Sequence, residues 1–238
     1  MSLSVGIIQS NYLPWRGYFD LIDDVDLFIV YDHVQYTKHD WRNRNRIKTG
    51  SGPAWISVPV RFSLSAPTPI DRTPVVYNAN WQKKHTRSID MAYRSSPYYQ
   101  LYQQDLLDII NTRFETISEL NVNLIQWIMR QLRIETPIRF SREFSPTGNK
   151  TDMLIETLKQ VGATDYLCGP ASRAYLETKK FRAAGIRVEY KSYDYQDYPQ
   201  LHGPFEPNIS VIDLLFNCGP DARRHLKSLS PNLKAAGT

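Results

Sequence analysis

The first 31 residues place a helical segment between two apolar strands, and this order constrains the fold more than any other feature of the chain. Residues Ser4–Gln9 (SVGIIQ) have the composition of a short buried strand, and residues Leu27–Tyr31 (LFIVY) that of a second one. Between them, Pro14 and Gly17 mark a loop, and apolar residues at helical spacing predict a helix over Tyr18–Val25. A strand–helix–strand unit predicts two parallel strands joined by a right-handed crossover.

The alternation of strands and helices continues beyond a helical middle segment. Residues 81–135 carry apolar side chains three and four apart, and Thr116 followed by Glu119 matches a capping box, with Asn80 as a further expected N-cap. The other expected strands are residues 55–60, 137–144, 164–170 and 186–195, and the other expected helices are 151–163, 171–185 and 210–216. We therefore predict one α/β domain over residues 1–238, with a mostly parallel sheet flanked by helices and residues 81–135 as an inserted helical layer.

Composition excludes several classes of protein. Of the 238 residues, 42% are hydrophobic and 22% charged, which is typical of a globular protein with a sizeable core. No apolar run reaches the roughly 18 residues of a membrane span, and the N-terminus lacks the pattern of a signal peptide, so a cytoplasmic location is expected. The net charge of +5 favours small anionic partners such as nucleotides or sugar phosphates and is too scattered to indicate nucleic-acid binding.

The sequence identifies no cofactor and no metal site. The two cysteines, Cys168 and Cys218, form no CxxC or Cys/His pattern and are expected to be small buried thiols. No P-loop, GxGxxG, GxSxG or HExxH motif occurs, so the chemistries that depend on those motifs lack their usual signature.

Polar side chains follow the first predicted strand. Gln9, Asn11 and Tyr12 come directly after it, at the end of a parallel strand where ligands of open α/β sheets bind. An alternative stays open, in which Trp15 and Phe19 plug the core and the two amides only cap a turn.

A second polar stretch, YDHVQYTKHDWRNRNRI, follows the second predicted strand and should lie beside the first loop. Asp32 is suited to act as a base, an orienting group or a metal ligand, and His33 can move protons near neutral pH. Lys38 and Arg44 can hold a phosphate or carboxylate, and Trp41 can stack on a ring. The alternative is a solvated loop, which stays open for Lys38 and Arg42 and is favoured for Arg46 and His39. His39, Arg42 and Arg46 are left out of the predicted site.

Two further positions enter the prediction. His85 lies four residues before Ile89 on a helix, a spacing that favours a packed histidine, and Gly169 stands in a Gly-Pro turn where backbone amides can meet an anion. The predicted catalytic residues are Asp32, His33, Lys38 and His85. The predicted substrate-binding residues are Gln9, Asn11, Tyr12, Tyr18, Gln35, Trp41, Asn43, Arg44, Asn45 and Gly169.

Five ordered sequence blocks resemble the WbqC-like family over nearly the whole chain. They are IIQSNYLPWRGYF, YDHVQYTKHDWRNRNRI, WISVPV, TDYLCGPASRAYL and HGPFEPNISVIDLLFNCGP. Two positions depart from the family pattern: Gln9-Ser10 stands where Gln-Pro is common, and His202 follows Tyr198 at a different spacing.

The resemblance implies an enzyme of bacterial surface-polysaccharide biosynthesis of the O-antigen (lipopolysaccharide) type. The expected reaction is transfer of an acyl or aminoacyl group to an amino sugar, with a nucleotide sugar or sugar phosphate as one partner and an acyl carrier protein as a possible donor. In such a transferase, Asp32 or His33 would be the base, Gln9, Asn43 or Asn45 would donate hydrogen bonds to the oxyanion, and Lys38 and Arg44 would hold a phosphate.

Two other functions stay open at this point. The strand order also resembles HUP-type nucleotide-binding domains, which transfer adenylyl groups, although Arg16-Gly17-Tyr18 stands where their His-x-Gly-His motif would lie. A non-catalytic binding protein of a glycan pathway would bind the same ligands without turnover.

Overall fold

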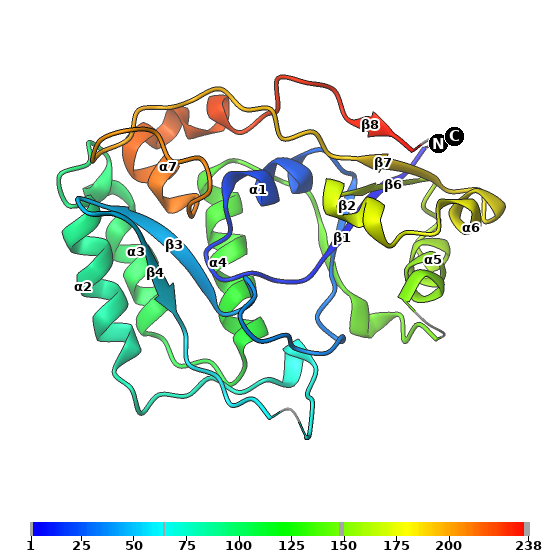
Figure 1. Ribbon diagram of the computed structural model, residues 1–238, viewed down its shortest axis with the longest axis horizontal. Helices are drawn as coiled ribbons and strands as arrows, with labels where there is room; N and C mark the ends of the chain where they lie inside the picture. The colour runs from blue at the N-terminus through cyan, green and yellow to red at the C-terminus, as the bar shows by residue number, and fades with distance from the viewer. Residues whose placement is uncertain (1, 64, 148–149, 236–238) are drawn as a thin grey trace.

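Within residues 2–63, 65–147 and 150–235, which the computed structural model describes, six strands form one mostly parallel sheet (Figure 1). Its order is β5–β2–β1–β6–β7–β8, in which β8 runs antiparallel to β7 and the other pairs are parallel. The strands are β1 (Ser4–Ile8), β2 (Leu27–Val30), β5 (Ile138–Phe140), β6 (Asp165–Cys168), β7 (Arg187–Tyr190) and β8 (Leu233–Lys234). Helix α1 (Arg16–Asp23) joins β1 to β2, which confirms the predicted parallel unit and the predicted α/β fold class.

Side chains of the central strands alternate between two separate cores, because successive residues of a strand point to opposite faces. Val5 and Ile29 belong to the smaller core, which α5 (Lys150–Gln160) and α6 (Thr178–Ala183) cover. Phe28 and Val30 belong to the larger core on the other face, with α1 and the helical middle segment. Cys168 lies in the smaller core and Cys218 in the larger one, both as free buried thiols, as predicted.

A helical layer and a hairpin flank the sheet and lie on the left in Figure 1. They are α2 (Trp81–Tyr93), α3 (Tyr99–Asn111), α4 (Ile117–Gln131) and α7 (Ile212–Cys218), with strands β3 (Arg44–Thr49) and β4 (Gly52–Ser57). The predicted capping box at Thr116 and Glu119 is confirmed, and it begins α4. Asn80 occupies the N-cap position of α2, as predicted, but it adopts a left-handed conformation and its side chain makes no capping hydrogen bond.

Several predicted elements have different bounds in the structure. The strand expected over residues 55–60 is β4, which spans Gly52–Ser57, and the strand expected over residues 137–144 ends at Phe140. Residues 171–185 form a 3-10 turn and the short α6, because the carbonyl of Ser172 accepts hydrogen bonds from the amides of both Tyr175 and Leu176 and so tightens the chain. The strand expected to continue to residue 195 ends at Tyr190. Residues 44–49 form strand β3, which was expected to be loop, since the inward-facing residue Asn45 conceals the period-two pattern. The 3-10 turns are η1 (Ile70–Arg72), η2 (Ser141–Glu143), η3 (Pro170–Ala174) and η4 (Gly219–His225).

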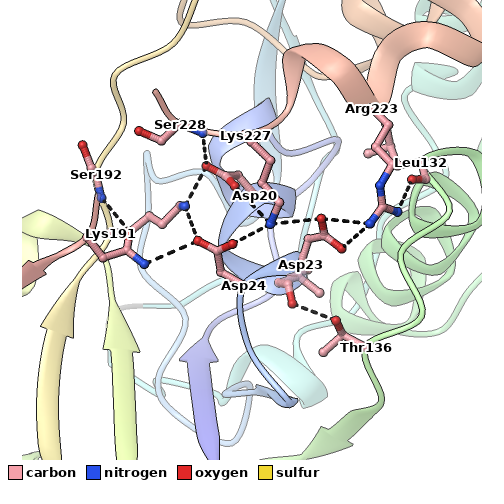
Figure 2. A network of polar contacts seen from close by, with 12 residues as sticks. Asp20, Asp23, Asp24, Leu132, Thr136, Lys191, Ser192, Arg223, Lys227 and Ser228 are labelled. Carbon is pink, nitrogen blue, oxygen red and sulfur yellow. Dashed lines mark hydrogen bonds and ion pairs between the residues drawn. The ribbon is translucent and has the colours of Figure 1, made fainter. Parts of the chain in front are cut away.

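A network of ion pairs fastens α1 to β7 and to the segment that follows η4 (Figure 2). Lys191 Nζ lies 2.9 Å from Asp20 Oδ2 and also pairs with Asp24. Lys227 pairs with Asp24 from the other side, and the Ser228 amide donates to Asp20 Oδ2 at 3.1 Å. The side chains of Lys191 and Asp20 are 3% and 0% exposed, so their charges are removed from water. The network fixes the helix that directly follows the polar loop after β1.

The pKa values of the two aspartates differ because their surroundings differ. Burial raises the pKa of Asp20, against the hydrogen bond from Lys191. Burial would raise the pKa of Asp24 as well, but the hydrogen bonds from Lys191 and Lys227 have the larger effect, so the pKa of this carboxyl group is lowered.

A buried carboxylate on α7 predicts that stability falls between weakly acidic and neutral pH. Asp213 is fully buried, and burial raises its pKa from 3.8 to about 6. The hydroxyls of Tyr198 and Tyr93 act in the opposite direction and limit this rise. The folded state therefore binds the Asp213 proton more tightly than the unfolded state does. The contribution of this proton to the free energy of unfolding, up to about 3 kcal/mol, is fully present below pH 4 and is lost as the pH rises through 6. We expect Asp213→Asn to flatten urea-unfolding free energies between pH 4 and 7. An unchanged slope in the variant would assign the pH dependence to other groups.

None of the helices in the described part of the chain combines the length and the apolar character needed to cross a membrane.

Candidate functional site

The direction of the strand connections reverses at β1, which makes the carboxyl ends of the central strands the candidate position for a ligand. From β1 the chain continues to β2 and then β5 on one side, and later to β6 and β7 on the other side. In open α/β sheets, the loops that leave such a point diverge and open a crevice for ligands. Two pockets lie among the loops that leave the strands here.

The first, named here the tryptophan pocket, has a volume of about 260 Å³ and is lined by two indoles and three asparagines. The lining residues are Asn11, Pro14, Trp15, Trp41, Asn45 and Asn208. Trp41 is 42% exposed, so its ring is available to a ligand. Ligand pockets typically combine apolar rings with a few well-placed polar groups, and this pocket has that composition.

Arg42 orients the two amides that follow β1. Its Nη2 donates to Gln9 Oε1 at 3.0 Å, and its Nη1 donates to Asn11 Oδ1. The side chain is only 11% exposed, and Asp40 Oδ2 lies 3.4 Å from Nη2. Since both amide oxygens face the guanidinium, the NH₂ groups of Gln9 and Asn11 point elsewhere, and no described residue accepts from them. These two donors are available to a ligand.

The position of Trp15 depends on the glycine two residues later. A Cβ atom on Gly17 would lie 2.4 Å from the Trp15 ring, so no larger residue fits beneath this indole. Tyr193 also packs against Trp15 in a T-shaped arrangement, with 4.8 Å between ring centroids. The indole therefore contacts both Gly17 and Tyr193.

We expect Gly17→Ala to displace Trp15 without unfolding the protein. Alanine favours the helix by up to about 1 kcal/mol relative to glycine, which offsets part of the cost of the contact. The measurement is the indole N–H resonance of Trp15 in a two-dimensional NMR spectrum, together with thermal unfolding. Gly50→Ala is the matched control, because its Cβ would meet nothing closer than 3.9 Å. An unmoved Trp15 resonance in Gly17→Ala would contradict this account of the pocket wall.

The second pocket, named here the aspartate pocket, lies between the carboxyl ends of β2 and β5 and the start of α4. It has a volume of about 120 Å³, and its polar lining includes Asp32, His33, Asp71, Ser118 and Ser141. Asp32 is 3% exposed and accepts from the Ser10 amide at 2.7 Å and from Ser118 Oγ at 2.6 Å. Burial raises the pKa of Asp32 against these hydrogen bonds. Both carboxylate oxygens therefore have protein donors that join β1, β2 and α4.

His33 carries a ring nitrogen that faces no protein partner. Its Nδ1 is hydrogen-bonded to Ser141 Oγ at 2.6 Å, whereas its buried Nε2 has no partner among the described residues. Burial lowers the pKa of His33, against the charges of Asp71 and Asp32. The imidazole is therefore largely neutral at pH 7 and can accept a proton.

Several predicted residues hold the loops through hydrogen bonds to backbone carbonyls, and of these Asn45 also lines the tryptophan pocket. Asn45 Nδ2 donates to the carbonyls of Tyr12 and Leu13, and Asn43 Nδ2 donates to the carbonyl of Val58. Both amides already have protein acceptors, unlike Gln9 and Asn11. Tyr18 is buried and donates to the Gln9 carbonyl at 3.2 Å, which supports the same loop from below.

Tyr12 and His85 form a separate buried pair. The Tyr12 hydroxyl and His85 Nδ1 are 2.9 Å apart, and neither residue lines the tryptophan or the aspartate pocket. Burial lowers the pKa of His85 to about 4, so this imidazole is neutral at physiological pH.

The other predicted residues lie outside the linings of the two pockets. Lys38 and Gln35 are exposed on the loop after β2. The Arg44 guanidinium stacks on the Trp55 ring at 4.4 Å, and the Trp55 ring lies 5.5 Å from that of Trp41. Gly169, at the end of β6, approaches the Tyr193 hydroxyl that backs Trp15.

The sequence prediction missed four groups that shape the two pockets. Arg42 resembled a solvated charge, and Trp15 resembled a core plug. Ser118 and Ser141 lie 86 and 108 residues from Asp32 and His33, so only the folded chain brings these pairs together. No group of three or more His, Cys, Asp or Glu side chains suited to a metal occurs in residues 2–63, 65–147 and 150–235.

Comparison with known proteins places the chain among relatives of the same length. The model of the WbqC-like protein family matches residues 9–225. An uncharacterized protein of Mycobacterium tuberculosis is 42% identical over 225 residues, covering 94% of this chain and 97% of the relative. No solved structure matches the chain significantly.

Proposed function

This chain belongs to the WbqC-like protein family, and we propose that it transfers an acyl or aminoacyl group to the amino group of a nucleotide-linked sugar in bacterial surface-polysaccharide biosynthesis. The observation that carries the proposal is the tryptophan pocket, in which indoles and amide donors meet at the carboxyl end of β1. A sugar has an apolar ring face and a rim of hydroxyl groups, and indole rings with amide N–H groups match these two features.

A ligand that occupies both pockets must have two recognition groups separated by the distance between the pockets. β1 and β5 are separated by β2 alone, which corresponds to about 10 Å at the usual spacing of strands. A nucleotide-linked sugar extends over this distance, since a diphosphate separates its two rings. We propose that one ring stacks on Trp41 and that the amino group enters the aspartate pocket. Lys38, on the exposed loop after β2, and Arg44, at the start of β3, are the cations proposed to face the phosphates.

His33 is proposed to be the base of the transfer. The amine of the acceptor must lose a proton as it attacks the acyl carbonyl, and the neutral imidazole of His33, which lines the aspartate pocket, accepts it. The oxyanion that forms needs hydrogen-bond donors, and the NH₂ group of Gln9, which has no acceptor among the described residues and lies at the adjacent strand end, is proposed as one of them. Asp32 is proposed to position the loops, because both of its oxygens are already engaged.

A product assay tests the proposed reaction. The protein is incubated with an acyl thioester, free or on an acyl carrier protein, and a set of nucleoside-diphosphate amino sugars, and N-acylated product is followed by mass spectrometry. We expect Trp41→Ala to raise KM for the amino sugar by about tenfold and Leu101→Ala, a change at an exposed apolar residue on α3, to leave it unchanged. Saturable binding of the nucleotide sugar without any product would reduce the function to binding. The absence of both binding and product would refute the proposal.

A further inference from the structure

The bottom of the aspartate pocket contains a serine hydroxyl and a histidine in direct contact. Ser141 begins the 3-10 turn η2 at the carboxyl end of β5, and His33 follows β2, the strand paired with β5. Ser141 Oγ and His33 Nδ1 are 2.6 Å apart. A short hydrogen bond between a hydroxyl and an imidazole is the arrangement that activates a serine as a nucleophile.

Two further observations single out this pair. Ser141 lines the aspartate pocket and also a neighbouring cavity of about 210 Å³, which places it between two spaces although the residue is only 1% exposed. His33 Nε2 and Asp71 Oδ1 are buried without hydrogen-bond partners among the described residues, and both residues line the same two cavities. Buried polar atoms rarely remain unpaired, so a bound group is expected between them.

We propose that Ser141 is the nucleophile of a covalent transfer and forms an acyl-ester intermediate, with His33 as its base. This inference rests on the proposed function, since the acyl donor is taken to be a thioester. It replaces direct attack of the amine by two successive steps through the enzyme.

The two steps balance in atoms and charge. In the first, the Ser141 hydroxyl proton moves to His33 Nδ1, Oγ bonds to the thioester carbonyl carbon, the C–S bond breaks, and the thiol leaves with the proton from His33. In the second, the sugar amine attacks the ester carbonyl, its proton passes to His33, the C–O bond breaks, and that proton returns to Ser141 Oγ. The carboxylate of Asp71 favours the imidazolium that exists between these transfers.

The test is capture of the acyl-enzyme with 4-nitrophenyl acetate and, separately, with an acetyl thioester, both in the absence of amino sugar. After an acid quench, peptide mapping by mass spectrometry should place the acetyl group on Ser141 of the unmodified sequence. Ser141→Ala should abolish this label. Ser96→Ala is the matched control and should keep it. Ser96 is likewise a buried serine, but its hydroxyl has no hydrogen-bond partner among the described residues and it lines neither cavity.

The pH profile of acetylation tests the part assigned to Asp71. Asp71→Asn should move the acidic limb of the profile to lower pH, since the carboxylate raises the pKa of His33. An unmoved limb would remove Asp71 from the mechanism.

The outcomes separate this inference from the proposed function. Acetyl-Ser141 without any N-acylated sugar would support the nucleophile and refute the proposed acceptor. N-acylated sugar without acetyl-Ser141 would support the proposed function and overturn the covalent route. No acetylation of Ser141 by either donor, or a label that persists in Ser141→Ala, would overturn the inference.

Discussion

Replacement of Lys191 by methionine is expected to destabilise the folded protein by about 3–5 kcal/mol at pH 7, because it leaves a buried carboxylate without its partner. Lys191 Nζ is 2.9 Å from Asp20 Oδ2, and the two side chains are 3% and 0% exposed. Lys227 approaches the same carboxylate no closer than 3.7 Å and is 45% exposed, so it cannot take over this role. The measurement is the free energy of unfolding in urea.

Two variants control this experiment. Lys227→Met removes a half-exposed cation of the same network and is expected to cost about 1 kcal/mol or less, since solvent screens exposed pairs. The double variant Lys191→Met/Asp20→Asn removes both buried charges and should recover part of the loss. Because burial raises the pKa of Asp20, the deficit of Lys191→Met should also shrink at acidic pH, where this carboxylate takes up a proton. A loss below 1 kcal/mol in Lys191→Met would show that the network does not fix α1.

Replacement of His33 by asparagine is expected to lower kcat for amine acylation by about 10²–10⁴-fold, the usual contribution of a general base. The asparagine amide can keep a hydrogen bond to Ser141 but cannot accept a proton near neutral pH. Since burial lowers the pKa of His33, the wild-type rate should be constant above pH 7 and fall in acid, with a midpoint below the ordinary value of 6.5.

His39→Asn is the matched control for this prediction. His39 lies on the same loop, is exposed, and adopts a left-handed backbone conformation with φ of 61°, which asparagine tolerates. Its replacement should leave kcat unchanged within about twofold. Equal losses in the two variants, or full activity of His33→Asn, would rule out His33 as the base.

The sequence predicted the parallel unit of β1, α1 and β2 because local patterns determine it. Apolar runs, the helical spacing after Gly17 and the capping box at Thr116 act over a few residues. The hairpin strand β3 was missed for the opposite reason, since its inward residue Asn45 is buried by hydrogen bonds to the loop after β1 rather than by apolar contact.

The candidate site was predictable only in part. The strand order predicted that the polar loops after β1 and β2 lie side by side. In the structure, Arg42 on the second loop donates hydrogen bonds to Gln9 and Asn11 on the first. The contact of His33 with Ser141 joins positions 108 residues apart and leaves no local pattern. The same holds for Lys191 and Asp20, which lie on different elements and meet only in the fold.

The loop from β1 to α1, which carries several residues of the candidate site, is fixed by contacts from many parts of the chain. The network around Lys191 holds α1 at one end, Gly17 and Tyr193 hold Trp15, and Arg42 holds the amides of Gln9 and Asn11. Asp32 fastens the same loop to β2 and α4 through Ser10 and Ser118. A pocket held at so many points is preorganised, which lowers the entropic cost of binding.

We propose above that the tryptophan pocket binds a nucleotide-linked amino sugar. The most direct test is calorimetric titration of the wild-type protein and of Trp41→Ala with a uridine-diphosphate amino sugar. Loss of one aromatic stacking partner costs about 1–3 kcal/mol, which corresponds to about 5–150-fold in affinity. We expect saturable one-to-one binding by the wild type and binding weakened by this factor in Trp41→Ala. Equal affinity of the two proteins, or no saturable binding by the wild type, would contradict it.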